Sequence, residues 1–284
     1  MFNQTQIKRF LKDNNIRPKK EFGQNFLIDK NINNKIVNYL NPTTEDIVIE
    51  IGAGFGNLTI PIAQSSYKIY AIEKDKRIAR VLRDNLSGLN NVEVIEGDFL
   101  KLDLNNILLK KDSKKVKIVG NLPYYISSPI IFHLLDYRNK IDYILFSLQK
   151  EVATRLISQP HSKDYGILSC LVNMYAECKS LIDIKRNSFY PQPKVDSSLV
   201  SLRFLESPRY EIVDEEGFRQ VIKAAFSKRR KQILNALSSY RGLGLSKDIA
   251  KGMLDELNID VRRRAEDIPL KDFVRLANAI SKRL

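Results

Sequence analysis

The sequence has few of the side chains that bind metals or form disulfides. Its 284 residues include two cysteines, Cys170 and Cys178, and two histidines, His133 and His161, with no Cys-x-x-Cys pair. A zinc site or a disulfide framework needs more of these residues at closer spacing, and a histidine-rich metal centre is excluded. We therefore expect no bound metal and a reducing compartment, the cytoplasm.

Long apolar runs are also missing. No stretch approaches the roughly 18 uncharged apolar residues that suggest a membrane-spanning helix. Charged residues interrupt the N-terminal region where a signal peptide would carry its apolar segment. Hydrophobic residues still make up 43% of the chain, which is typical of a globular protein. We expect a globular monomer that is not exported and has no membrane partner.

Acidic residues are outnumbered by basic ones. Forty-seven lysines and arginines against 33 acidic residues give a net charge of +14. Such an excess suits a polyanionic partner, because basic side chains displace counterions from phosphates, although a lysine-rich solvated surface would give the same total. The basic residues are clustered at 16–21, at Lys228, Arg229, Arg230 and Lys231, and at Arg262, Arg263 and Arg264. Clustering favours nucleic acid, and we expect the last two clusters to contact its phosphate backbone.

From residue 47 onward, short β-branched runs alternate with segments of helical periodicity. Strands are predicted at 47–51, 68–73, 92–97, 116–121 and 141–149, and helices at about 57–65, 75–87, 99–109 and 127–136. Alternation with nearly unbroken apolar strands predicts an α/β, Rossmann-like fold whose mostly parallel sheet is covered on both faces. Two more strands, near 168–184 and 195–205, are expected to form an antiparallel pair at the sheet edge.

The two ends of the chain differ from this central pattern. Residues 1–40 are predicted to form two short helices around a polar loop, which must lie against another part of the chain. Ser207-Pro208 marks a break, after which helices are predicted at 215–226, 228–240, 246–257 and 270–282. We expect a catalytic domain at 1–207, with 1–40 as a lid, and a basic helical domain at 208–284.

A glycine-rich segment follows the first predicted strand. Glycines at 52, 54 and 56 let the backbone approach a bound cofactor, which could be NAD, FAD or S-adenosylmethionine, or they simply make a tight strand–helix turn. Glu73, Asp98 and Asn121 stand at or just after the next three strands. All four positions therefore fall on the carboxyl edge of one parallel sheet, where open α/β folds bind ligands.

Each of these strand ends has a chemical interpretation. Glu73 can hold both hydroxyls of a ribose, and Asp98 can accept from an adenine amino group. The competing explanation, that these acids cap the following helices, accounts for any one of them but not for the series. The spacing Gly-x-Gly-x-Gly with Glu50 before it resembles class I methyltransferases more than dehydrogenases, which favours S-adenosylmethionine as the cofactor.

The tetrapeptide Asn121-Leu-Pro-Tyr124 stands at the end of the fourth predicted strand. The Asn121 oxygen and the Leu122 carbonyl can accept the hydrogens of an adenine N6 and so favour a nitrogen with a usable lone pair. Pro123 fixes the chain direction, and Tyr124 offers a ring on which a flipped-out base stacks. A structural turn with a buried tyrosine is the alternative explanation.

Asn-Leu-Pro-Tyr followed by Tyr-Ile-Ser-Ser-Pro-Ile resembles the small-subunit (16S) rRNA adenine N6,N6-dimethyltransferases of the KsgA/RsmA type. Further blocks resemble the same family and span nearly the whole chain, at 22–27, 149–153, 189–197, 226–231 and 264–266. The resemblance implies dimethylation of two adjacent adenosines in the 3′-terminal hairpin of small-subunit rRNA, within an assembling 30S-type particle. It also implies that Asn25 and Leu27 close over S-adenosylmethionine, and that Phe189 faces Tyr124 across the target base.

Three other functions are weighed against this one. A large-subunit rRNA adenine methyltransferase of the macrolide-resistance type shares the fold, but Leu122 and Asp196 favour the small-subunit type. A non-catalytic RNA-binding assembly factor would not need Asn121, Pro123 and Tyr124 intact. A nicotinamide dehydrogenase would leave the tetrapeptide and the basic clusters unexplained.

Overall fold

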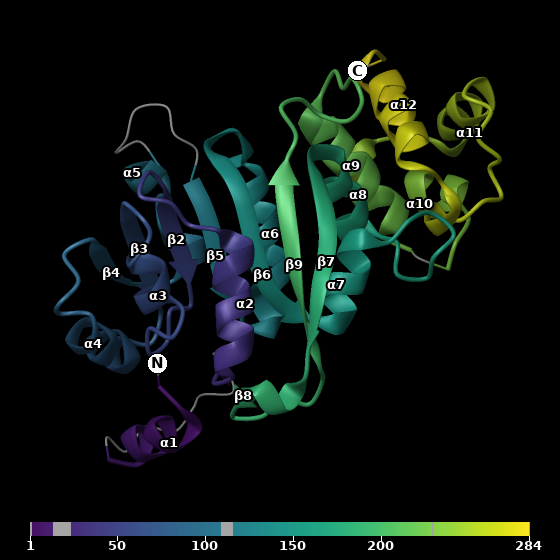
Figure 1. Cartoon of the computed structure of the whole chain (residues 1–284). Coiled ribbons are helices and arrows are strands. Elements are labelled where there is room, and N and C mark those ends of the chain that lie inside the picture. Colours follow the sequence, from purple (N-terminus) through teal and green to yellow (C-terminus); the bar gives the residue numbers. More distant parts are fainter. Residues whose placement is uncertain (1, 14–23, 109–115, 229, 284) are drawn as a thin grey trace. The chain divides into compact units, whose positions relative to one another are not determined.

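The computed structural model describes residues 2–13, 24–108, 116–228 and 230–283 (Figure 1). Within these ranges no helix is long and apolar enough to cross a membrane. No group of three or more His, Cys, Asp or Glu side chains in the described part of the chain is arranged to hold a metal ion. The basic segment 16–21 lies outside the described residues.

The chain alternates strands and helices up to β6 and becomes mainly helical after β9. The strands are β1 (Phe26–Leu27), β2 (Ile47–Ile51), β3 (Lys68–Glu73), β4 (Val92–Glu96), β5 (Val116–Asn121), β6 (Ile141–Gln149), β7 (Ala176–Ile184), β8 (Phe189–Tyr190) and β9 (Ser197–Phe204). The helices before β7 are α1 (Gln4–Asp13), α2 (Lys30–Leu40), α3 (Thr59–Ala63), α4 (Lys76–Asn85), α5 (Asn105–Leu108), α6 (Ser127–Leu135), α7 (Lys150–Ile157) and α8 (Ile167–Tyr175). The last four are α9 (Glu215–Phe226), α10 (Ile233–Ser238), α11 (Lys247–Glu256) and α12 (Leu270–Ser281).

A seven-stranded sheet has the order β4-β3-β2-β5-β6-β9-β7. The neighbours from β4 to β6 are parallel, and β9 is antiparallel to β6. Every residue of the central strand β2 is buried, so both faces of the sheet are covered, as its unbroken apolar sequence requires. The predicted mostly parallel sheet is confirmed.

The sheet edge agrees with the prediction in part. The Leu205 N–H donates to the Tyr175 carbonyl, and the Ser198 hydroxyl donates to Asp183, so β7 and β9 run antiparallel. The strand predicted at 168–184 is wrong in its first half, which forms α8. Apolar side chains are buried around most of this helix, and a helix buried on all sides has the same continuous apolar sequence as a buried strand.

Two predicted helices are shorter than expected. The segment 99–109 forms a single 3₁₀ turn at Phe99–Lys101 and the short helix α5. The segment 228–240 is helical only over Ile233–Ser238, because Gln232 has extended backbone angles and makes a β-bridge with Arg264. The remaining helices of the C-terminal segment lie close to their predicted positions.

The chain forms two compact units, each with its own interior. The first contains residues 1–153 and 178–204, and the second contains 154–177 and 205–284. In the second unit, the Arg209 Nε donates to the Asn173 carbonyl at 2.7 Å, and the His161 N–H donates to the Glu266 carbonyl at 2.8 Å. The segment 154–177 therefore packs with the C-terminal helices. The predicted domain boundary at residue 207 instead assigns this segment to the first domain.

Candidate active site

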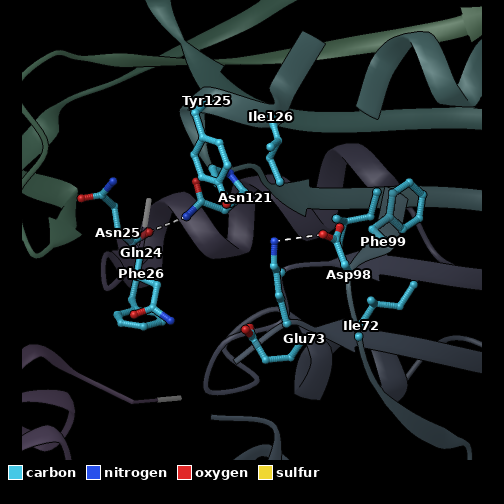
Figure 2. A pocket seen from close by; sticks show the side chains of 15 residues that line it. Gln24, Asn25, Phe26, Ile72, Glu73, Asp98, Phe99, Asn121, Tyr125 and Ile126 are labelled. Atoms are coloured by element: carbon cyan, nitrogen blue, oxygen red, sulfur yellow. Dashed lines mark hydrogen bonds and ion pairs between the residues drawn. The ribbon is translucent and has the colours of Figure 1, made fainter. Parts of the chain in front are cut away.

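A pocket opens at the carboxyl edge of the parallel strands, within the first unit. Six of the predicted residues line it: Asn25, Gly52, Glu73, Asp98, Asn121 and Pro123 (Figure 2). They come from the ends of β2, β3, β4 and β5 and from the segment before β1. The pocket contains about 640 Å³ of empty space, a figure that includes open solvent at its mouth.

The glycine-rich turn after β2 needs glycine for its backbone conformation. Gly52 and Gly54 have φ angles of 76° and 57°, in the left-handed region. A Cβ on Gly54 would also stand 3.2 Å from the ring of Phe26. The Gly54 N–H donates to Glu73 at 3.0 Å, so the turn is held against the end of β3.

Glu73 is the most enclosed acid on the pocket wall. Its two carboxylate oxygens accept from the Gly54 and Asp75 N–H groups, at 3.0 and 2.9 Å. Burial raises the pKa of Glu73, against the lowering effect of these two hydrogen bonds. Glu73 lines the pocket, and an ionised carboxylate has about four acceptor positions, so the side chain keeps acceptor capacity for ribose hydroxyls, the chemistry that S-adenosylmethionine presents.

Asp98 stands across the pocket and is already paired. The Lys74 ammonium lies 2.9 Å from its Oδ2, and the Leu100 N–H donates to its Oδ1 at 3.2 Å (Figure 2). Burial alone would raise the pKa of Asp98, but these hydrogen bonds lower it below its usual value. Asp98 is therefore an ionised acceptor, which suits an adenine amino group.

Asn121 ends β5 and points into the pocket beside the segment before β1 (Figure 2). Its Nδ2 donates to the Asn25 carbonyl oxygen at 2.6 Å. The reversed amide would place two oxygens against each other, so the partner fixes which atom faces Asn25. Oδ1 has no hydrogen bond within the described residues and is available as an acceptor.

The rest of the tetrapeptide follows the strand end. Leu122 is buried, and its N–H donates to the Ser147 carbonyl at 3.2 Å, while no described group donates to its own carbonyl. Pro123 begins a 3₁₀ turn over Tyr124–Ile126. Tyr124 is half-buried with its hydroxyl 3.0 Å from the Ser197 Oγ. Tyr124 does not line the pocket in this arrangement, whereas its neighbour Tyr125 does.

Two of the predicted residues are buried near the pocket instead of lining it. Leu27 and Phe189 are 5% and 2% exposed and are register partners in the ribbon formed by β1 and β8. Both belong to one apolar core with residues of α2 and the central sheet. Leu27 lies beside the glycine-rich turn, in a second hollow behind it. The stacking role of Phe189 stays a prediction. Stacking would require an accessible face of the Phe189 ring, and the ring is buried in this structure.

The glycine-rich turn also anchors the N-terminal segment. The ring of Phe55 lies within 6.0 Å, centroid to centroid, of the rings of Phe2, Phe10 and Phe26. The Asn57 side chain exchanges hydrogen bonds with the Phe2 backbone and donates to the Leu27 carbonyl at 3.0 Å. The segment over the pocket is thereby attached to the turn that forms its floor.

Several pocket residues were not predicted. Gln24, Phe26, Lys74, Phe99, Tyr125 and Ile126 line the pocket, and each is within two residues of a predicted position. Gln24 donates to Asp75, the N-cap of α4, at 3.1 Å. Sequence proximity to the predicted positions is the signal that could have found them.

A buried acid lies behind the turn. Glu50 is 2% exposed and accepts from the Thr59 hydroxyl at 2.6 Å. Burial raises the pKa of Glu50 to about 8; the Thr59 hydrogen bond lowers it, and nearby Glu73 raises it further. Glu50 is therefore mostly protonated at neutral pH and joins β2 to α3.

The second unit brings two basic clusters together. Gln232 forms a β-bridge with Arg264, and the Ile233 N–H donates to the Arg263 carbonyl at 2.7 Å. All predicted members within the described residues are exposed: Lys228, Arg230, Lys231, Arg262, Arg263 and Arg264. Arg229 lies outside the described residues. The clusters form one surface, which we call the basic surface.

The family model for "Ribosomal RNA adenine dimethylase" matches residues 15–282. A relative from Alkaliphilus oremlandii, named ribosomal RNA small subunit methyltransferase A, is 41% identical over 266 residues, covering 93% of this chain and 92% of the relative. A protein of the same name from Bacillus pumilus is 40% identical over 280 residues, covering 98% and 96%.

Two solved structures have the same fold over most of the chain. A dimethyladenosine transferase from Plasmodium falciparum superposes with a TM-score of 0.76 at 26% identity, covering 89% of this chain and 96% of that one. The 23S rRNA methyltransferase ErmE superposes with a TM-score of 0.65 at 26% identity, covering 90% and 100%. The predicted methyltransferase fold is thus confirmed by likeness to solved structures as well as by the sheet order.

Proposed function

Because the chain belongs to the ribosomal RNA adenine dimethylase family, we propose that it transfers methyl groups from S-adenosylmethionine to N6 of two adjacent adenosines in small-subunit rRNA. Each adenosine receives two methyl groups, and the pair lies in the 3′-terminal hairpin. The proposal extends to the setting: a monomer acting in the cytoplasm on an assembling 30S-type particle.

The observation that carries this proposal is the fixed orientation of Asn121. Adenine N6 is a poor nucleophile because its lone pair is delocalised into the ring. Asn121 Oδ1 and the Leu122 carbonyl would accept the two N6 hydrogens and favour a nitrogen that can attack. Asn25 holds the Asn121 amide with its oxygen free for this purpose, and such preorganised acceptors need no rearrangement during the reaction.

The pocket residues fit S-adenosylmethionine. Glu73 would hold the ribose hydroxyls, Asp98 the adenine amino group, and Gly52 would let the backbone approach, with Asn25 and Leu27 on the covering side. When bound, the cofactor supplies a methyl group on a positively charged sulfur. Positioning at the strand ends then supplies most of the rate enhancement, so no histidine is needed as a general base. The described residues that line the pocket include no histidine.

The small subunit is preferred over the large subunit as the substrate. Two relatives named for the small subunit, from Alkaliphilus oremlandii and Bacillus mycoides, are 41% and 38% identical and align over 92% and 91% of their own length. ErmE, which is named for 23S rRNA, is 26% identical. The basic surface supports RNA as the partner through its exposed arginines and lysines.

Labelled S-adenosylmethionine with undermethylated small subunits tests the proposal. The expected product is dimethyladenosine at two adjacent positions of the 3′-terminal hairpin, mapped by mass spectrometry of nuclease fragments. Large subunits serve as the parallel substrate, and Asn121→Ala as the catalytic control. Label in large-subunit rRNA alone would support the macrolide-resistance type, and cofactor binding without transfer to either subunit would support a non-catalytic assembly factor.

A further inference from the structure

The hydroxyl of Tyr124 reaches a residue from a distant part of the chain. Its oxygen lies 3.0 Å from the Ser197 Oγ, across 73 residues of sequence. Ser197 is the first residue of β9 and is fully buried. The contact therefore joins the catalytic tetrapeptide to the end of the segment 189–197, two blocks that the sequence keeps apart.

The sheet fixes the position of Ser197. It is the register partner of Gln149 at the end of β6. The carbonyl of the preceding residue, Asp196, accepts from the Lys150 N–H at 3.1 Å. Backbone pairing thus holds Ser197 against the end of β6, so its hydroxyl is a fixed partner for the tyrosine.

The Ser197 hydroxyl has one partner among the described residues. That partner is the Tyr124 hydroxyl, and a buried hydroxyl without a partner is costly. Ser198, the next residue, instead donates to Asp183 at 2.8 Å. The two adjacent serines therefore make different contacts. The Ser198 hydroxyl links β9 to β7, and the Ser197 hydroxyl is hydrogen-bonded to Tyr124.

We propose that Ser197 is a positioning residue for methyl transfer, because its hydroxyl sets the direction in which the Tyr124 ring extends beside the target base. The phenolic oxygen lies at the far end of the ring, so one hydrogen bond there limits the swing of the whole side chain about χ1. This inference rests on the proposed function, in which Tyr124 stacks on the flipped adenine.

Ser197→Ala is the direct test, with Ser198→Ala as its matched control. Both remove a buried hydroxyl from the same strand. Single-turnover methylation at saturating RNA and cofactor should slow about fivefold in Ser197→Ala, the effect of one neutral hydrogen bond. Ser198→Ala should transfer at the wild-type rate, and RNA affinity should be unchanged in both. A wild-type rate in a folded Ser197→Ala protein would overturn the inference.

A double-mutant cycle separates positioning from general damage to the fold. Tyr124→Phe keeps the ring and removes the hydroxyl, so it should slow transfer about as much as Ser197→Ala, and the double variant should be no slower than either. Rate reductions that multiply would show that Ser197 does not act through Tyr124. If Ser197→Ala does not fold, Tyr124→Phe decides alone, since a wild-type rate there overturns the inference. Inactivity of the unsubstituted protein on every rRNA would instead overturn the proposed function.

Discussion

Asn121 Nδ2 donates to the backbone oxygen of Asn25 at 2.6 Å, across 96 residues of sequence. The residue at the end of β5 is therefore oriented by the segment that covers the pocket. Because the partner is a carbonyl oxygen, it accepts only the nitrogen side of the amide, and Oδ1 is left for the substrate. In the proposed function, one contact therefore both covers the cofactor and orients the Asn121 amide.

The first prediction concerns Asn121. Asn121→Ala removes an acceptor for the N6 hydrogen, so methyl transfer should slow on the order of 100-fold, as when one preorganised group of an active site is removed. RNA affinity should stay near the wild-type value, because the basic surface is untouched. Single-turnover kinetics measure the step, with exposed Asn38→Ala of α2 as the control. Transfer at the wild-type rate would make the tetrapeptide a structural turn.

The second prediction concerns cofactor affinity. Glu73→Ala should weaken S-adenosylmethionine binding by about 2–4 kcal/mol, because two charge-assisted hydrogen bonds to ribose are removed. Glu96→Ala is the matched control, since Glu96 is the register partner of Glu73 on β4 and is exposed outside the pocket. Titration calorimetry gives both affinities. Equal binding by the two variants would remove Glu73 from the cofactor site.

The third prediction concerns the basic surface. Neutralising Lys228, Arg230, Lys231, Arg263 and Arg264 should weaken RNA binding and reduce its salt slope by about 0.7–0.9 for each phosphate that the protein no longer neutralises. Arg262 should contribute less, because its guanidinium already makes two hydrogen bonds to Asp260, both at 3.1 Å. Lys30→Gln with Lys35→Gln, on the exposed side of α2, is the comparison. An unchanged salt slope would leave the basic surface without an RNA role.

The fourth prediction concerns pH. The pKa of Glu50 is about 8 in the folded protein and near 4.5 when unfolded, so the folded state binds more protons between these values. Stability should therefore fall as pH rises from about 5 to 8. Glu50→Gln keeps an acceptor for Thr59 and should remove this part of the pH dependence.

Melting temperatures at about pH 5 and about pH 8.5, on either side of this range, measure the effect. The Glu50→Gln protein should match the wild type at the lower pH and exceed it at the higher one. Glu206→Gln, an exposed position after β9, should change neither value. A wild-type protein whose stability does not decline with pH relative to Glu50→Gln would contradict the assignment of a neutral Glu50.

The sequence predicted the site best where a glycine or polar residue recurs at the end of each successive strand. Gly52, Glu73, Asp98 and Asn121 each follow a strand of a parallel sheet or end it, and such strand ends must meet at one edge. Their convergence in one pocket could therefore be predicted before any coordinates. The helix α8 could not, because a segment buried on all sides has no periodicity that distinguishes a helix from a strand.

Pairs of distant side chains could not be predicted from a single sequence. Nothing local indicates that Asn57 holds the Phe2 backbone, or that Ser197 reaches Tyr124. Gln232 and Arg264 are also brought together by the fold alone, which turns two short basic runs into one surface. Strand register and side-chain packing determine such pairs, and the secondary-structure propensities of the residues do not indicate them.

The attachment of the segment 24–27 has a consequence for turnover. Dimethylating two adenosines takes four transfers, so spent cofactor must be replaced between them. Above the pocket, Gln24 is bonded to Asp75 and Asn25 to Asn121, while Leu27 beside them is anchored in the core. If the segment lifts to let spent cofactor leave, the second of these hydrogen bonds breaks. Under the proposed function, each departure would then also release the Asn121 amide until the next cofactor is bound.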